Sequence, residues 1–215
     1  MTAYCKNFNR EPSRPFDVTC AAVGLLLLWP FFLLIAIAIK LDDGGPVFYK
    51  QLRVGKHFRL FGMLKFRSMV IGADGGSLLT REGDSRITRV GRQLRRYKLD
   101  ELPQLLNVLR GEMQLVGARP EVERYVQHFR REYACILQQA PGITDPASLA
   151  YRHEDRLLST ERREEEYIRE ILPRKLALSV SYQQRRSFLS DLGILCKTVF
   201  GIEERGEAGL GLTEP

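Results

Sequence analysis

The chain has 215 residues, enough for one domain, or for one domain together with a membrane segment. Its 33 Lys and Arg residues exceed its 26 Asp and Glu residues, which gives a formal net charge of +7 and an isoelectric point near 9.4. This balance predicts an anionic partner, such as phosphate groups or acidic lipids. The four Cys and three His residues are dispersed through the chain, which disfavours a zinc site.

An uncharged segment from Val18 to Ile39 stands out near the N-terminus. Its 22 residues would form a helix about 33 Å long, enough to cross the hydrocarbon core of a bilayer. Pro30, near its middle, removes one backbone hydrogen bond and favours a kink. Basic residues flank both ends, and the positive-inside tendency therefore places both ends on the cytoplasmic side. The residues alone leave open a re-entrant helix that bends at Pro30 and a kinked helix that spans the membrane.

Two opposite charges lie just before this segment. Arg14 and Asp17 are one helical turn apart, so they could pair at the membrane interface and fix the point where the helix enters it. The alternative is that they are ordinary flanking charges.

The rest of the chain predicts an α+β domain of helices with a short β-hairpin. Strands are expected at 47–49 and 58–61 around a turn at 54–56, and a loop rich in Gly and Asp is expected at 72–85. Residues 141–146 are expected to be irregular.

Helices follow from hydrophobic spacing and from capping signals. Asp100 is a candidate N-cap, Gly111 is a stop signal, and Pro173 is expected to interrupt a charged surface helix. The expected helices cover 88–98, 100–109, 121–138, 159–172 and 188–200. The last has an apolar stripe that suits the core or a membrane interface.

An acidic pair, Asp100 and Glu101, lies among many cations. Guanidinium groups suit phosphate, because their planar donors can bind two oxygens at once. One carboxylate could attack phosphorus while the other holds Mg²⁺, which usually takes one or two protein carboxylates together with substrate phosphates. The alternative is that both acids only complement a helix dipole. The surrounding cations are Lys65, Arg67, Arg86, Arg92, Arg95, Arg96, Lys98 and Arg119.

From about Arg14 to Phe200, the chain resembles the bacterial sugar transferases known as monotopic phosphoglycosyl transferases. The core Asp-Glu-Leu-Pro-Gln at 100–104, followed by Arg-Pro at 119–120, is highly specific. The other matching segments, all in order, are Arg14-Pro-Phe-Asp17, Pro46-Val-Phe-Tyr-Lys-Gln-Leu-Arg-Val-Gly55, Lys65-Phe-Arg-Ser-Met69, Val116-Gly-Ala-Arg-Pro120, Pro141-Gly-Ile-Thr144 and 191–199.

The resemblance implies a reaction. Asp100 would attack the β-phosphate of a UDP-sugar, releasing UMP and leaving a covalent phosphosugar that polyprenyl phosphate then accepts. Glu101 corresponds to the ligand of Mg²⁺, with Mn²⁺ as the alternative metal. The residues expected to bind the substrate phosphates are Lys65, Arg67, Arg95, Arg119 and Arg152.

The resemblance also implies a location. It favours a re-entrant helix broken at Pro30, with the chain held in the lipid bilayer on the cytoplasmic face of a bacterial inner membrane. The expected regions are a membrane segment at 1–40, a cytoplasmic catalytic domain with interfacial amphipathic helices at 41–200, and a disordered tail at 201–215. Assembly into a homo-oligomer is left open.

Three segments depart from the family pattern. Ala118 stands where many members have Pro, and Trp29 precedes Pro30 where Ser is common. Residues 145–152 differ from the usual sequence, so the placement of Arg152 opposite a family Arg rests on a weak alignment, and the sugar is left open.

Two rival interpretations are a non-catalytic protein that binds acidic lipids through its basic patch, and a membrane-tethered nucleic-acid binder. The few aromatic residues are not interleaved with the basic run, so no nucleic-acid partner is expected.

Overall fold

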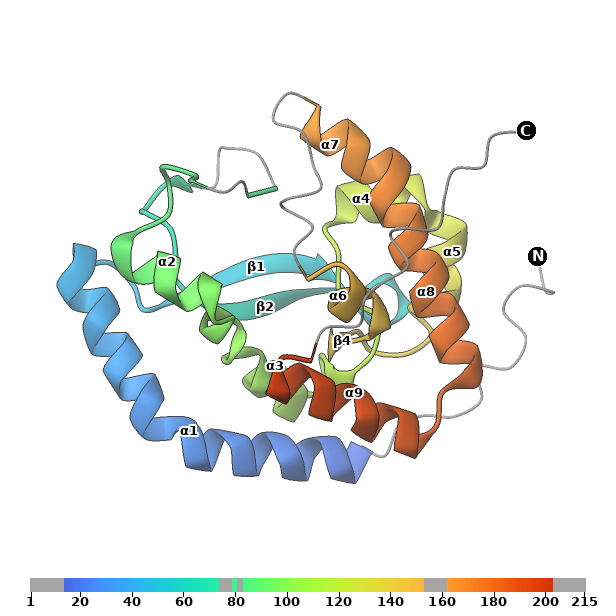
Figure 1. Ribbon diagram of the computed structural model, residues 1–215, viewed down its shortest axis with the longest axis horizontal. Helices are drawn as coiled ribbons and strands as arrows, with labels where there is room; N and C mark the ends of the chain where they lie inside the picture. The colour runs from blue at the N-terminus through green and yellow to red at the C-terminus, as the bar shows by residue number, and fades with distance from the viewer. Residues whose placement is uncertain (1–13, 74–78, 81–82, 153–161, 203–215) are drawn as a thin grey trace.

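The computed structural model describes residues 14–73, 79–80, 83–152 and 162–202. These residues form a mixed domain of helices and two small two-stranded sheets, resting on one long N-terminal helix (Figure 1). This agrees with the α+β prediction. The expected tail falls almost entirely outside the described residues, as does part of the loop at 72–85.

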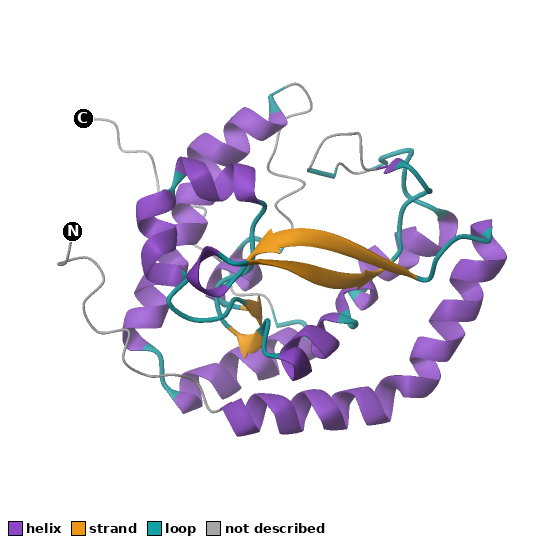
Figure 2. Cartoon of the chain, turned by 180° about the vertical axis from the view of Figure 1, so that it is seen from behind, coloured by secondary structure: helices purple, strands orange, loops and turns teal. Residues whose placement is uncertain are grey.

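Helix α1 (Arg14–Asp43) contains the whole uncharged segment, and Pro30 lies inside it. By length and composition it is apolar enough to cross a membrane. Figures 1 and 2 show that the helix is bent and that its two arms run along the base and one side of the domain. A proline inside a helix removes a backbone hydrogen bond and crowds the preceding turn, so a bend is the expected physical consequence.

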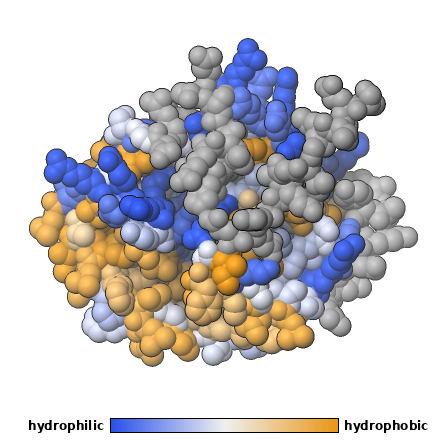
Figure 3. Space-filling view, viewed as in Figure 1, coloured by the Kyte–Doolittle hydropathy of each residue, from blue (hydrophilic) through white to orange (hydrophobic). Residues whose placement is uncertain are grey.

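Most of α1 does not pack against the domain. Its buried residues are only Asp17, Ala21 and Ile39. Figure 3 shows a continuous hydrophobic lower face, with the hydrophilic residues gathered above it. Soluble monomers rarely expose apolar patches of this kind, so the face is suited to lipid. Its exposed large side chains on α1 are Val23, Leu26, Leu27, Trp29, Phe31, Leu33, Leu34, Ile37 and Leu41.

The expected hairpin is present and its strands are longer than predicted. Strands β1 (Phe48–Val54) and β2 (Leu60–Phe66) pair antiparallel, from Phe48 opposite Phe66 to Val54 opposite Leu60. A 3₁₀ turn, η1 (Lys56–Phe58), joins them.

The segment around the acidic pair is not one regular helix. Helix α2 (Arg89–Arg96) confirms the short basic helix, and the 3₁₀ turn η3 (Leu99–Glu101) then leads into α3 (Gln104–Arg110). The prediction that Asp100 caps a helix is therefore wrong, because the residue lies inside the 3₁₀ turn. Gly111 ends α3 in the left-handed region, at φ 83°, as the stop signal predicted.

A small parallel sheet was not predicted. Strand β3 (Gln114–Val116) pairs with β4 (Gly142–Thr144), so the expectation of irregular structure at 141–146 is wrong. The two strands approach so closely beyond the pair that a Cβ added to Gly142 would lie 2.1 Å from the backbone nitrogen of Gly117. Glycine is therefore required at this crossing.

The helix expected at 121–138 is two helices. Helices α4 (Glu123–His128) and α5 (Arg130–Ile136) meet at Phe129, whose φ of −126° and ψ of 42° are not helical. These two helices form the connection between β3 and β4.

The C-terminal half is helical. Pro173 does not interrupt the helical segment. It lies in the first turn of α8 (Leu172–Arg185), directly after a π-helical turn, where proline is tolerated. The helix at 188–200 is confirmed as α9. The other elements here are α6 (Pro146–Ala150), α7 (Arg163–Glu166), the π-helical turn η5 (Tyr167–Ile171) and α9 (Phe188–Phe200).

Each arm of α1 contributes to a different hydrophobic cluster. Ala21 packs with Met63 and Val108 beneath the hairpin and α3, whereas Ile39 packs with Phe66 near α2. A third cluster lies among α4, α5 and α8. The domain therefore holds α1 at two places, and the acidic pair lies on η3 between two helices, α2 and α3, that both pack against α1.

Candidate active site

The acidic pair is placed by the elements on either side of it. Turn η3 packs against α2 and against β2. Lys98 precedes the turn in the left-handed region, at φ 56°, a conformation that costs free energy for a residue with a side chain. This residue separates α2 from η3, and residues held in such conformations are common at functional sites.

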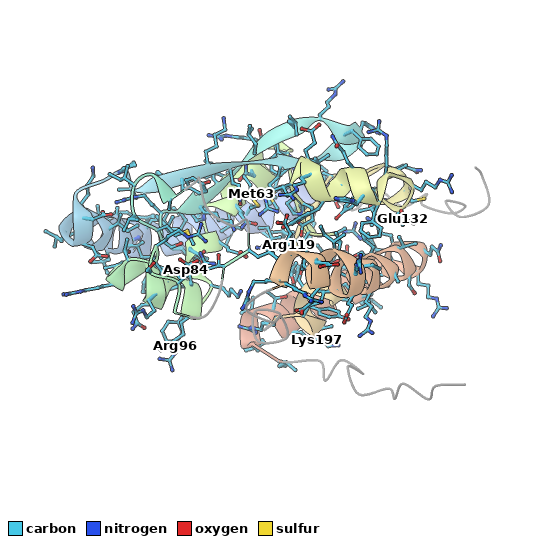
Figure 4. The ribbon with its side chains drawn as sticks, turned by 90° about the horizontal axis from the view of Figure 1, so that it is seen from above. Met63, Asp84, Arg96, Arg119, Glu132 and Lys197 are labelled. Atoms are coloured by element: carbon cyan, nitrogen blue, oxygen red, sulfur yellow. The ribbon has the colours of Figure 1, made fainter. Side chains whose placement is uncertain are left out.

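Glu101 is held by two cations. The guanidinium of Arg119 donates two hydrogen bonds to its carboxylate, one of them 3.0 Å long, and Lys65 Nζ lies 3.6 Å from Oε1. Figure 4 shows Arg119 near the middle of the molecule. Burial alone would raise the pKa of Glu101, but the charges of Arg119 and Lys65 lower that pKa by more. Glu101 is therefore ionised at neutral pH.

Asp100 lies in a different environment. It is 7% exposed, and its Oδ1 atom is buried without a hydrogen-bond partner. Burial raises the pKa of Asp100, and the neighbouring charge of Glu101 adds to the rise, while Lys65, Arg95 and Lys98 oppose it. Two adjacent carboxylates with opposite pKa shifts suit two different roles.

The cations around the pair are not equivalent. Burial lowers the pKa of Lys65 to about 8, although Glu101 acts to raise it. Arg95 is half-buried in the last turn of α2, close enough to Asp100 to lower its pKa. The described part of the chain offers the Arg95 guanidinium no hydrogen-bond acceptor, so it is available to a bound anion.

Arg67, predicted to bind phosphate, has another role. It is 6% exposed, donates from Nε to the carbonyl oxygen of Pro46 at 2.6 Å, and binds both carboxylate oxygens of Asp43. A Cβ on Gly45 would lie 2.5 Å from this guanidinium. Arg67 thus connects the C-terminal end of α1 to the hairpin, and its donors are used inside the fold.

Arg152 lies beside the C-terminal end of α9. Its guanidinium lies 3.6 Å from the position of a Cβ on Gly201, at the C-terminal end of α9. A cation is stabilised there by the helix dipole. Of the predicted phosphate ligands, Lys65, Arg95 and Arg119 act directly on the carboxyls of Asp100 and Glu101.

The two residues expected to anchor α1 both bind inside the domain. Arg14 donates to the carbonyl oxygens of Val108 and Leu109, at 2.6 and 3.0 Å, and caps the end of α3. Asp17 is buried, with its Oδ2 atom unpartnered. No direct ion pair joins Arg14 and Asp17 in the described residues, so they fix the start of α1 separately.

Two polar residues of α3 were not singled out from the sequence. Asn107 is fully buried, accepts from the backbone N–H of Leu64 at 2.9 Å and donates to the carbonyl oxygen of Gly62 at 2.9 Å. Its side chain therefore pairs with the backbone N–H and C=O groups on the outer edge of β2, as the backbone of a further strand would. Gln104 is equally buried. The sequence pattern that could have identified Asn107 and Gln104 is the recurrence of polar residues on the buried face of an otherwise apolar helix.

Residues 8–205 match the sequence model of the bacterial sugar transferase family. The chain is 36% identical over 204 residues to the exopolysaccharide production protein ExoY of Rhizobium meliloti (strain 1021), covering 86% of this chain and 83% of the relative. It is 40% identical over 190 residues to a UDP-glucose:undecaprenyl-phosphate glucose-1-phosphate transferase of Caulobacter vibrioides, covering 86% and 67%.

A third relative differs in the sugar that its name gives. It is the UDP-N-acetylgalactosamine-undecaprenyl-phosphate N-acetylgalactosaminephosphotransferase of Aeromonas hydrophila, 40% identical over 142 residues, covering 64% of this chain and 34% of the relative. The family match extends over nearly all of the chain and includes the acidic pair with its cations. The chain therefore belongs to the bacterial sugar transferase family and is a sugar-phosphate transferase.

Proposed function

We propose that this chain moves a sugar-1-phosphate from a UDP-sugar to a polyprenyl phosphate such as undecaprenyl phosphate, as a membrane step in polysaccharide or glycoconjugate synthesis. The observation that carries the proposal is a buried carboxylate, Asp100, beside the half-buried carboxylate of Glu101, surrounded by cations and lying between two helices that pack against the apolar α1. The names of the Caulobacter and Aeromonas relatives support an undecaprenyl phosphate acceptor. They differ in the sugar, which is why the proposal names none.

Asp100 is proposed as the nucleophile. Its carboxylate oxygen forms a bond to the β-phosphorus while the bond from that phosphorus to the bridging oxygen breaks, and the electron pair leaves on UMP. The sugar phosphate is then bound to Asp100 as an acyl phosphate, a mixed anhydride of the carboxylate and the phosphate. An oxygen of polyprenyl phosphate next attacks the same phosphorus, the bond to Asp100 breaks, and the carboxylate is regenerated.

The cations supply electrostatic stabilisation. Phosphoryl transfer depends mainly on positioning and on neutralising negative charge at the phosphoryl oxygens. Arg95 is free of hydrogen-bond acceptors in the described residues, so it can bind a donor phosphate without breaking a contact. Lys65 and Arg119 neutralise Glu101, and they set the positive potential of the site.

The residues fit a Mg²⁺ ion. The described residues contain no group of three or more His, Cys, Asp or Glu side chains, which disfavours a site made of protein ligands alone. Mg²⁺ usually needs only one or two carboxylates with substrate phosphates, and the half-buried Glu101 carboxylate offers hard oxygens beside Asp100. Glu101 would hold the ion, with Mn²⁺ as the alternative. Bound there, the metal would neutralise charge on the diphosphate.

The apolar face would place this chemistry at a bilayer. We propose that α1 enters and leaves the membrane on the same side, the cytoplasmic face of the inner membrane, with its bend at Pro30 in the lipid. Exposed apolar residues on α9, including Leu189 and Val199, continue the face. A lipid phosphate could then reach Asp100 from the membrane while the nucleotide sugar arrives from water.

Release of UMP from a panel of UDP-sugars, with undecaprenyl phosphate and Mg²⁺, tests the proposal. The wild type should release UMP with at least one sugar, and Asp100→Asn and Glu101→Gln should not. Glu165→Gln, a change at an exposed residue paired with Arg169, is the matched control and should be fully active. Equal release by Asp100→Asn would contradict the proposed nucleophile.

A further inference from the structure

The acidic pair continues into a buried stripe. From η3 through α3 the buried positions are 100, 103, 104, 107 and 108, which recur every three or four residues. Both elements pack against β2. Asp100, Gln104 and Asn107 therefore lie on one face of this segment, directed toward the hairpin.

The two amides on this stripe differ in their partners. Asn107 binds Gly62 and Leu64 on β2, and also donates to Glu112 at 2.7 Å, so all of its polar groups are used. Gln104 is 0% exposed, and neither its Oε1 nor its Nε2 atom has a partner. A buried amide without hydrogen bonds is unfavourable, so its presence calls for a ligand or a group that it binds in another state.

Asp100 has a buried acceptor that lacks a donor, whereas Gln104 has a buried donor that lacks an acceptor. Its Oδ1 atom is buried and unpartnered, and a substrate phosphorus cannot approach an oxygen enclosed by protein. The attacking atom must then be Oδ2, and Oδ1 requires a donor from inside the fold. Gln104 lies on the same buried stripe, and its unpartnered Nε2 atom is a donor from inside the fold.

We propose that Gln104 positions the nucleophile: its side-chain N–H donates to Asp100 Oδ1 when the donor sugar nucleotide is bound, and so presents Oδ2 to the β-phosphorus. The inference rests on the proposed role of Asp100. Gln104 touches no reacting atom and acts through Asp100. Lys65, Arg95 and Lys98 are near enough to lower the pKa of Asp100, but none of them donates a hydrogen bond to its Oδ1 atom.

Burst kinetics without acceptor test the inference. The variant Gln104→Leu keeps the approximate side-chain volume and removes the donors, and Gln104→Met gives a second test of the same loss. Because a hydrogen bond to a charged group is lost at the transition state, the rate constant of the UMP burst should fall about 10- to 100-fold in both. The UDP-sugar concentration for half-maximal burst rate should stay within about twofold of wild type.

The control is Gln183→Leu. Gln183 is also buried with an unpartnered Oε1, but it lies on α8 and its amide reaches the carbonyl oxygen of Ile136. This variant should keep the wild-type burst rate, and the thermal midpoint of Gln104→Leu should not fall below that of wild type. A general packing defect would instead lower the midpoint of the Gln104 variants and change both kinetic parameters.

The outcomes separate this inference from the proposed function. A burst in Asp100→Asn would overturn the role of Asp100 itself. If Asp100→Asn is inactive while Gln104→Leu and Gln104→Met both retain the wild-type burst, the proposed function stands and the positioning role of Gln104 is wrong.

Discussion

Arg67 provides a direct comparison between a structural and a substrate-binding role. It is 6% exposed and its three hydrogen bonds hold Asp43 and Pro46, while the Asp43 side chain is 24% exposed. Breaking a fully buried ion pair costs about 3–5 kcal/mol. Because Asp43 reaches water, we expect Arg67→Met to lower the free energy of unfolding by about 2–3 kcal/mol, less than for a fully buried pair.

Asp43→Ala should cost a similar amount, because it leaves the Arg67 guanidinium buried without its carboxylate. The double variant should lose less than the sum of the two, with a coupling of about 1–3 kcal/mol. The assay is urea unfolding in detergent micelles, measured beside the KM for the UDP-sugar. If Arg67→Met raised that KM tenfold and left stability unchanged, Arg67 would be a phosphate ligand and the reasoning would be refuted.

Three further predictions concern the charged groups of the domain. Arg119→Met removes the hydrogen bonds that Glu101 accepts and leaves Lys65 as its ion-pair partner among the described residues. The value of kcat/KM for UMP release should therefore fall by about 100-fold or more, and a change below threefold would contradict the role of Arg119. In EDTA, Asp100→Asn should raise the thermal midpoint at pH 8 more than at pH 4. Burial raises the pKa of Asp100 in the folded state, so the wild type loses stability as the pH rises from about 4 through that pKa, whereas Asn cannot ionise. An equal difference in thermal midpoint at both pH values would show that burial does not raise the pKa of Asp100. Arg186→Met removes buried bonds to Asp191, to two glutamines and to the backbone, and should cost about 3–5 kcal/mol in urea unfolding. A loss below 1 kcal/mol would mean that this network is not structural.

The sequence predicted the helices and strands that are determined by residues close together in the chain. The uncharged run gives α1, the Gly111 stop ends α3, and the hairpin follows from two apolar strands flanking a turn. The parallel pair β3–β4 could not be read in the same way. Its strands have three residues each and are joined across two helices, so the pairing depends on tertiary packing.

The family motifs predicted residues that the fold brings together, and also one, Arg67, whose guanidinium is used elsewhere. Asp100, Glu101, Lys65 and Arg119 come together as the family resemblance implied. Arg67 resembles its neighbours in charge, but its acceptor, Asp43, lies 24 residues away and only the fold brings the two together. Buried amides such as Gln104 carry no charge signal, so their role emerges only from partners that are present or missing.

The central claim is that a covalent phosphosugar forms on Asp100, and mass spectrometry without an acceptor tests it most directly. The intact protein, incubated with its UDP-sugar and Mg²⁺, should gain the mass of one sugar phosphate on the peptide that contains Asp100, with release of about one equivalent of UMP. Adding undecaprenyl phosphate should remove the adduct. If no adduct forms, and UMP appears only when the acceptor is present, the sugar phosphate passes directly between substrates and the account is contradicted.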